Sequence, residues 1–180
     1  MNWKSYIEDV KYKGATYGHK DMEFEKFSDL PKHVPFPLEV ALTSAPSGKE
    51  KVLKAQGWRV ANAHAVTSTY DHFMKYISNC KGEFSVVKNM YAATCSGWFS
   101  DKSAAFLASG RPVVLQETGF SNYIPCGEGL FAVKNTEEAA NAIETIESNY
   151  DWHSKRAFEI AQEYLDTTKV LGKLLKESGI

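Results

Sequence analysis

Cysteine is scarce in this chain of 180 residues, and the spacings that would give it a structural role are missing. Cys80, Cys95 and Cys126 are odd in number and far apart, whereas disulfide scaffolds and zinc sites show paired cysteines. We therefore predict three reduced, mostly buried thiols, as is usual in a cytoplasmic protein. No apolar stretch follows the first residues, so the sequence predicts no signal peptide either.

Long apolar runs and an excess of one charge are also missing. The longest apolar runs, such as residues 104–108, are far shorter than the roughly 18–20 residues that a bilayer requires. The 21 basic and 22 acidic residues give a net charge of −1, whereas nucleic-acid binding favours a basic surplus on one face. We therefore expect no membrane span and no nucleic-acid partner.

The familiar signatures of cofactor and metal sites do not occur. The segment 43–50 is no Walker loop, because Thr43 replaces its first glycine and Glu50 replaces its Ser or Thr. The chain contains no GxGxxG, GxSxG, HExxH or DxD motif, and its five histidines are scattered. We predict no resident cofactor and no metal site.

The chain divides into two parts that differ in composition and in the pattern of apolar residues. The first part, residues 1–36, is rich in aromatic residues and lysine. It predicts a hairpin around the Lys13-Gly14 turn and a helix over residues 19–30, which prolines at 31, 35 and 37 bring to an end. We interpret residues 1–36 as an amino-terminal extension made of a hairpin and a helix.

The second part, residues 37–180, alternates strands with helices. The apolar patterns predict strands over 38–42, 58–61, 83–87, 112–115 and 129–133. Helical patterns cover 47–56, 69–78, 100–109, 135–148, 151–164 and 167–176. This alternation predicts the α/β class: a Rossmann-like three-layer domain with a mostly parallel sheet of about five strands and carboxyl-terminal helices. In such folds a ligand sits at the carboxyl ends of the strands.

The stretch 96–103 is a polar, glycine-bearing turn that leads into a helix. We predict that Ser100 caps this helix, with Asp101 in its first turn. The free amides there, together with Ser100, Lys102 and Ser103, could hold a diphosphate. On chemistry alone, a capped helix that merely contains a lysine explains the pattern equally well.

Residues 96–133 read SGWFSDKSAAFLASGRPVVLQETGFSNYIPCGEGLFAV. This stretch resembles the carboxyl-terminal, donor-binding domain of bacterial glycosyltransferases of the GT-B fold. Its segment LASGRPVV is similar to the MASGxPVV segment of the common retaining members. The resemblance covers residues 83–146 strongly.

The resemblance implies a function. The chain would be the half of a glycosyltransferase that binds a nucleoside diphosphate sugar, transferring a hexose. An amino-terminal domain or a partner chain would bind the acceptor, so the chain by itself would be incomplete for catalysis. The carboxyl-terminal helices would then lack a domain to brace, and we expect an exposed apolar patch through which two copies could pair.

The resemblance also implies a set of substrate-binding residues, although it assigns no catalytic one. Ser100, Lys102, Ser103 and the helix amides would hold the diphosphate, and the loop 118–121 would be a second phosphate or sugar contact. The base and ribose would lie near residues 83–88 and Glu128. The full predicted set is Glu83, Lys88, Gly97, Ser100, Asp101, Lys102, Ser103, Thr118, Gly119, Phe120, Ser121 and Glu128.

One departure from the family concerns stereochemistry. The retaining members place two glutamates eight residues apart, and here the aligned positions are Gly97 and Ala105. Whether the sugar's configuration is retained or inverted therefore stays open.

Two other functions remain to be weighed. The first is a noncatalytic α/β module for binding or assembly, which would not respond to UDP or GDP in a titration. The second, a phosphoacceptor receiver domain, needs an acidic pair after its first strand, and residues 38–44 contain none.

Overall fold

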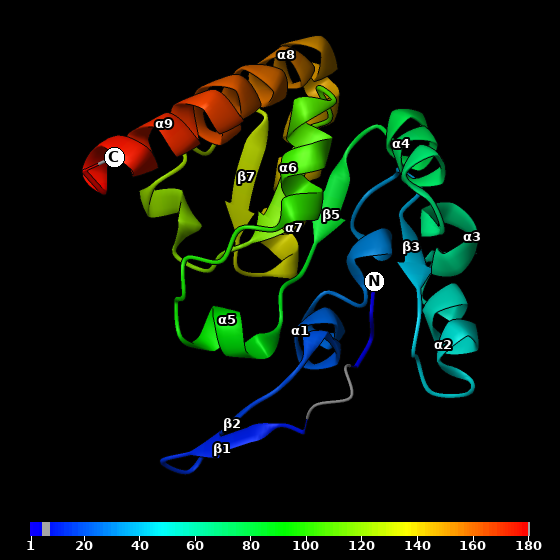
Figure 1. Ribbon diagram of the computed structural model, residues 1–180. Helices are drawn as coiled ribbons and strands as arrows, with labels where there is room; N and C mark the ends of the chain where they lie inside the picture. Colours follow the sequence, from blue (N-terminus) through cyan, green and yellow to red (C-terminus); the bar gives the residue numbers. More distant parts are fainter. Residues whose placement is uncertain (5–7, 180) are drawn as a thin grey trace.

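The computed structural model describes residues 1–4 and 8–179 of a mixed α/β chain (Figure 1). Its first element is an antiparallel hairpin of β1 (Val10–Tyr12) and β2 (Ala15–Tyr17). The turn residues Lys13 and Gly14 have φ angles of +47° and +79°, a conformation that glycine adopts at little cost. The predicted hairpin around Lys13 and Gly14 is confirmed. Residues 5–7 of the extension lie outside the described part of the chain.

The predicted helix of the extension is confirmed in a shorter form. Helix α1 spans Lys20–Lys26, and a 3-10 turn, η1 (Leu30–Lys32), follows it. Phe24, Phe27 and Leu30 are buried in the main core, so the extension packs onto the rest of the chain.

The predicted parallel strands are present but are divided between two sheets. Strand β3 (Glu39–Leu42) pairs with β4 (Arg59–Asn62), while β5 (Glu83–Ser85), β6 (Val113–Gln116) and β7 (Leu130–Val133) form a sheet in the order β5-β6-β7. Both are parallel. The α/β class is therefore confirmed, whereas the single sheet of five strands is replaced by sheets of two and three.

Two features separate β3 from β5. The first residues of the chain lie along β3, where Asn2 bridges Thr43 and the Trp3 amide donates to the Thr43 carbonyl at 3.0 Å. A cavity of about 630 Å³ then lies between the strands, lined by residues 38–41 on one side and 83–86 on the other.

Helices cover both faces of the three-stranded sheet. Val114 and Val133 share a core with the buried alanines of α7 (Thr136–Ser148). Val113, Leu115 and Leu130 face a second core with α6 (Asp101–Ala108) and α8 (Tyr150–Ile160). This part of the chain therefore has the predicted three layers.

The remaining helices follow the chain order. Around the two-stranded sheet lie α2 (Lys49–Ala55), α3 (Ala63–Thr67) and α4 (Tyr70–Asn79). Further along lie α5 (Asn89–Ala93), the 3-10 turn η2 (Phe120–Asn122), the π-helical turn η3 (Ala161–Leu165) and α9 (Thr167–Glu177). The short helices α3 and α5 were not predicted.

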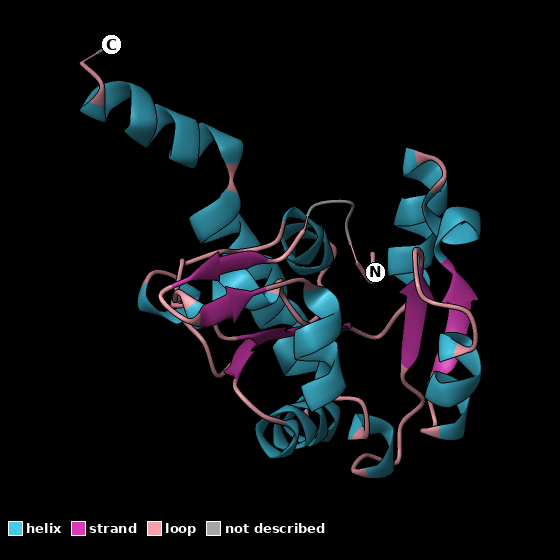
Figure 2. Ribbon diagram, turned by 90° about the horizontal axis from the view of Figure 1, so that it is seen from below, coloured by secondary structure: helices cyan, strands magenta, loops and turns pink. Residues whose placement is uncertain are grey.

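Helix α9 projects away from the rest of the chain (Figure 2). None of its residues is buried, and it exposes Val170, Leu171, Leu174 and Leu175. The predicted exposed apolar patch is therefore confirmed. Within residues 1–4 and 8–179, no helix is long and apolar enough to span a bilayer.

The cysteines correct one prediction. All three are free thiols, as expected, but Cys95 and Cys126 are exposed and Cys80 is only half-buried. The prediction of mostly buried thiols is wrong because Cys95 and Cys126 lie in loops, outside the regular elements that form the cores.

Candidate functional site

The carboxyl ends of β5 and β6 meet at one edge of the three-stranded sheet, which we call the carboxyl edge. Residues 86–89 follow β5 and residues 117–119 follow β6. Helix α1 lies at this end of the molecule, near α5 (Figure 1). This is the region where the sequence predicts a ligand.

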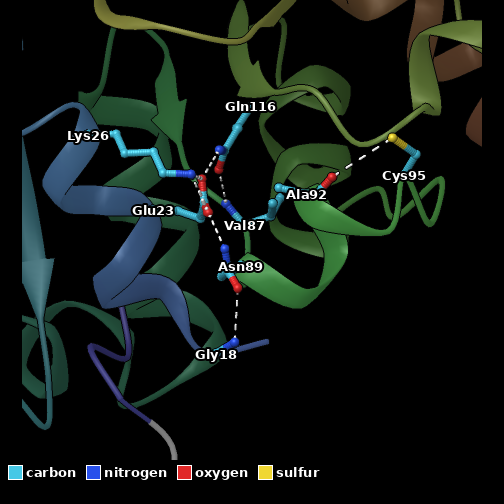
Figure 3. A network of polar contacts seen from close by, with 8 residues as sticks. All are labelled: Gly18, Glu23, Lys26, Val87, Asn89, Ala92, Cys95 and Gln116. Carbon is cyan, nitrogen blue, oxygen red and sulfur yellow. Dashed lines mark hydrogen bonds and ion pairs between the residues drawn. The ribbon is translucent and has the colours of Figure 1, made fainter. Parts of the chain in front are cut away.

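A buried carboxylate anchors α1 at the carboxyl edge (Figure 3). Glu23 is completely buried, and its carboxylate accepts hydrogen bonds from Asn89 Nδ2 at 2.6 Å, Lys26 Nζ at 2.8 Å and Gln116 Nε2. Burial alone would raise the pKa of Glu23, but the hydrogen bonds from Asn89, Lys26 and Gln116 outweigh it and hold that pKa below its ordinary value. Glu23 is therefore a charged group inside the protein with its partners in place.

The same network joins α1 to both strand ends. Gln116 Oε1 accepts from the Val87 amide at 3.1 Å, and Asn89 Oδ1 accepts from the Gly18 amide at 3.0 Å. Because these contacts fix the first turn of α1, they also fix Lys20, which lies one turn before Glu23.

Lys102 forms a second charged contact, which lies along β5 because its partner, Glu83, is the first residue of that strand. Its Nζ lies 2.5 Å from Glu83 Oε1 and 3.3 Å from Ser85 Oγ. The Glu83 side chain is only 3% exposed, and its Oε2 has no hydrogen-bond partner among the described residues. Lys102 is thus the countercharge of a buried carboxylate, a role that sequence analysis did not foresee.

Lys20 brings a further positive charge to the same place. Burial lowers its pKa to about 8, and the nearby charges of Lys102 and Lys88 lower it further, while Glu83 and Asp101 act in the opposite direction. Within the described residues, its ammonium group makes no hydrogen bond or ion pair. We call Lys20, Lys88 and Lys102 the lysine cluster. Its mutual repulsion would be relieved by a bound anion.

The amino end of α6 differs from the prediction. Ser100 occupies the cap position, but its hydroxyl accepts no hydrogen bond from the helix amides. Instead Asp101 Oδ1 accepts from the Lys102 amide at 2.8 Å, and Ser100 Oγ lies 3.4 Å from the same oxygen. A short acidic side chain in the first turn can take the role of the cap, because it too satisfies a free amide.

Two predicted loops lie against each other. The Gly97 amide donates to the Thr118 carbonyl, and Thr118 Oγ1 donates to the Trp98 carbonyl, both at 2.7 Å. Gly119 has a φ of +96°, and a Cβ there would lie 3.2 Å from the Cys95 carbonyl oxygen. Thr118 is therefore occupied in holding the loops together.

Three predicted site residues lie elsewhere. Ser103 and Phe120 are buried in the core, Phe120 against Phe99, so neither presents its side chain to a ligand. Glu128 precedes β7 and pairs with Arg156 at 3.1 Å, at the amino end of the sheet. Since β6 and β7 are parallel, Glu128 lies at the amino edge of the sheet, and the residues that follow β5 and β6 lie at the other edge.

The structure brings together Glu83, Lys88, Asp101 and Lys102, and it adds Lys20. Of the other predicted residues, Gly119 and the exposed Ser121 follow β6, Gly97 contacts Thr118, and Ser100 precedes α6. Among the residues that the structure describes, no three histidine, cysteine, aspartate or glutamate side chains gather as a metal site requires.

No protein-family model matches the chain, and a search of curated proteins gave no match.

Proposed function

We propose that this chain is the donor-binding half of a glycosyltransferase and holds a nucleoside diphosphate hexose at the carboxyl edge. The observation that carries the proposal is the lysine cluster. The charges of Lys88 and Lys102 both lower the pKa of Lys20, and among the described residues Glu83 is the one acidic side chain that pairs with a member of the cluster.

The balance of charge favours a diphosphate. The cluster contributes three positive charges, while Glu83 and Asp101 contribute two negative ones, so a net positive charge remains before any ligand binds. The amino end of α6 adds the partial positive charge of its free amides. A diphosphate would pair with Lys20 and Lys88 in charge-assisted hydrogen bonds and leave the Lys102–Glu83 pair in place.

The cavity between β3 and β5 suits the nucleoside. Apolar side chains such as Phe36, Trp58 and Phe106 line it, and Glu83 and Ser85 add polar groups beside Lys102. The unpaired Glu83 Oε2 could accept a hydrogen bond from a ribose hydroxyl. In this proposal the two parallel sheets are halves of a Rossmann-like layout, and the β3–β5 gap is where a ligand enters.

The lysines would also serve the reaction. When the hexose leaves, negative charge grows on the departing diphosphate, and positive groups already fixed in place stabilise that charge. The acceptor and any base that activates it would come from a second domain or a partner chain, because the carboxyl edge supplies only the donor side.

An exposed apolar face supports the second candidate, a noncatalytic assembly module. Val170, Leu171, Leu174 and Leu175 of α9 are each about half exposed, which is unusual for a helix that packs within its own domain. An assembly module would keep this face and would show no response to nucleotides.

Calorimetric titration with UDP and GDP tests the proposal. We expect at least one of them to bind, and we expect Lys20→Ala to weaken that binding about 10- to 100-fold, the scale of a lost charge-assisted contact. Lys155 provides the matched control. Its side chain is 69% exposed on α8, beside Arg156, and Lys155→Ala should change nothing. Silence with both nucleotides would contradict the donor-binding function.

The titration should also depend on pH. Because the pKa of Lys20 is about 8, the free protein loses this charge as the pH rises from 7 to 9, and the affinity should fall. A bound anion stabilises the protonated amine, so binding at pH 8 should take up protons. Repeating the titration in buffers of different ionisation enthalpy measures that uptake. An affinity that is constant from pH 7 to 9 would show that Lys20 does not contact the ligand.

A further inference from the structure

Two aromatic side chains, Trp98 and Tyr123, are exposed around Gly97. Trp98 is 43% exposed although its indole stacks on Tyr91, with ring centroids 4.7 Å apart and planes inclined by 17°. Tyr123, which is 77% exposed, lies across Gly97, 4.0 Å from where a Cβ of that residue would be. An open apolar surface therefore flanks a residue that has no side chain of its own.

The protein holds Trp98 in this position firmly. Its carbonyl accepts from Thr118 Oγ1 at 2.7 Å, its amide donates to Ser96 Oγ at 3.3 Å, and Tyr91 supports one face of the ring. A ligand that covers the other face would thus pay little for ordering the side chain. Trp3 and Trp58, by contrast, are buried in the core.

The aromatic surface is joined to one member of the lysine cluster, Lys88, through Tyr91. Lys88 Nζ lies 5.9 Å from the centroid of the Tyr91 ring, and Tyr91 in turn carries Trp98. Another member of the cluster, Lys102, borders the cavity between β3 and β5. A diphosphate at the cluster would therefore have a pocket on one side and the aromatic surface on the other.

We propose that Trp98 and Tyr123 bind the hexose ring of the donor, an inference that rests on the proposed function. A pyranose has faces made of C–H groups and a rim of hydroxyls. The C–H faces can pack on an indole ring, because its large apolar area contributes most of the energy of such a contact. The hydroxyls of the rim need polar neighbours. Ser121 and Asn122 are exposed next to Tyr123 and supply such neighbours. The nucleoside, with polar groups that need matched partners, goes to the cavity and Glu83.

A comparison of nucleotides with and without the sugar tests this placement. UDP and UDP-glucose, and GDP and GDP-mannose, are titrated against the parent, Trp98→Ala and Trp98→Phe. For whichever pair the parent binds, Trp98→Ala should weaken the binding of the sugar nucleotide about 5- to 10-fold, the scale of an aromatic contact. The affinity for the diphosphate alone should stay within about twofold of the parent's. Trp98→Phe should keep part of the difference.

Trp152 provides the matched control, because it is also 43% exposed and lies on α8, away from the carboxyl edge. Trp152→Ala should bind both ligands as the parent does. Equal weakening of diphosphate and sugar nucleotide by Trp98→Ala would mean that the ring contacts the nucleotide, and no weakening of either would mean that it contacts no ligand. Both results overturn the hexose placement while the proposed function stands. If the parent binds none of the four compounds, the proposed function fails and the placement fails with it.

Discussion

Glu23→Ala is expected to lower the free energy of unfolding by about 4 kcal/mol, because it removes a buried charge whose partners remain. Asn89 and Gln116 would keep buried amide groups without an acceptor, and Lys26 would lose its ion pair. Denaturant unfolding followed by circular dichroism measures the change.

Glu25 on the same helix is the matched control for Glu23. Its side chain is 50% exposed and pairs with Lys49, and an exposed ion pair contributes about 0–1 kcal/mol, so Glu25→Ala should have a small effect. The contribution of Glu23 to the free energy of unfolding should also depend on pH. Because its folded pKa is lowered from the ordinary 4.5, its contribution is present above that pH and is lost as the pH falls through the folded pKa. Equal effects of the two substitutions would show that the network around Glu23 is not needed for stability.

Lys102→Ala should destabilise the protein by about 2 kcal/mol, the second largest effect. On the helix dipole alone, removing a lysine from the first turn of a helix would cost no stability, because a positive charge is unfavourable there. The contact with Glu83 outweighs the dipole, because removing Lys102 leaves a carboxylate that is only 3% exposed without its countercharge. The 38% exposure of the lysine keeps the cost below that of a fully buried pair.

A double variant separates this contact from other effects of the substitution. Adding Glu83→Gln to Lys102→Ala removes the unpaired charge and should restore more than half of the lost stability, as a double-mutant cycle in thermal and denaturant unfolding would show. If Lys102→Ala is as stable as the parent, the ion pair does not contribute and Lys102 is free to serve a ligand alone.

The elements of the fold could be predicted because their signals are local. Residues 112–115 form a short apolar run bounded by Gly110 and the polar residues after Gln116, and β6 is indeed buried along its whole length. The start of α7 also has a local signal, because Asn135 is a favoured capping residue and its side chain accepts a hydrogen bond from the Glu138 amide. The division into two sheets was not, because it depends on the pairing of residues 2 and 43, which no local pattern shows.

The site could be predicted only in part, because some of its residues are marked by local patterns and others are brought together from distant segments. Lys102 was recognised from the turn before its helix, whereas Glu83 as its partner and Lys20 as its neighbour come from distant segments. One signal was available and was not used: Glu23 lies on the same helical stripe as Phe27 and Leu30, and an acidic residue on an apolar stripe is a candidate for burial. The position of Glu128 follows from the sequence alone, since it precedes its strand and therefore lies at the amino edge of a parallel sheet.

The central claim is that a nucleoside diphosphate binds at the carboxyl edge, and a crystal structure of the chain with UDP or GDP tests it most directly. Our account predicts electron density for two phosphates among Lys20, Lys88 and Lys102, with the nucleoside directed to the cavity beside Glu83. Phosphates bound at the opposite edge near Glu128 and Arg156, or a carboxyl edge left empty at saturating nucleotide, would contradict it.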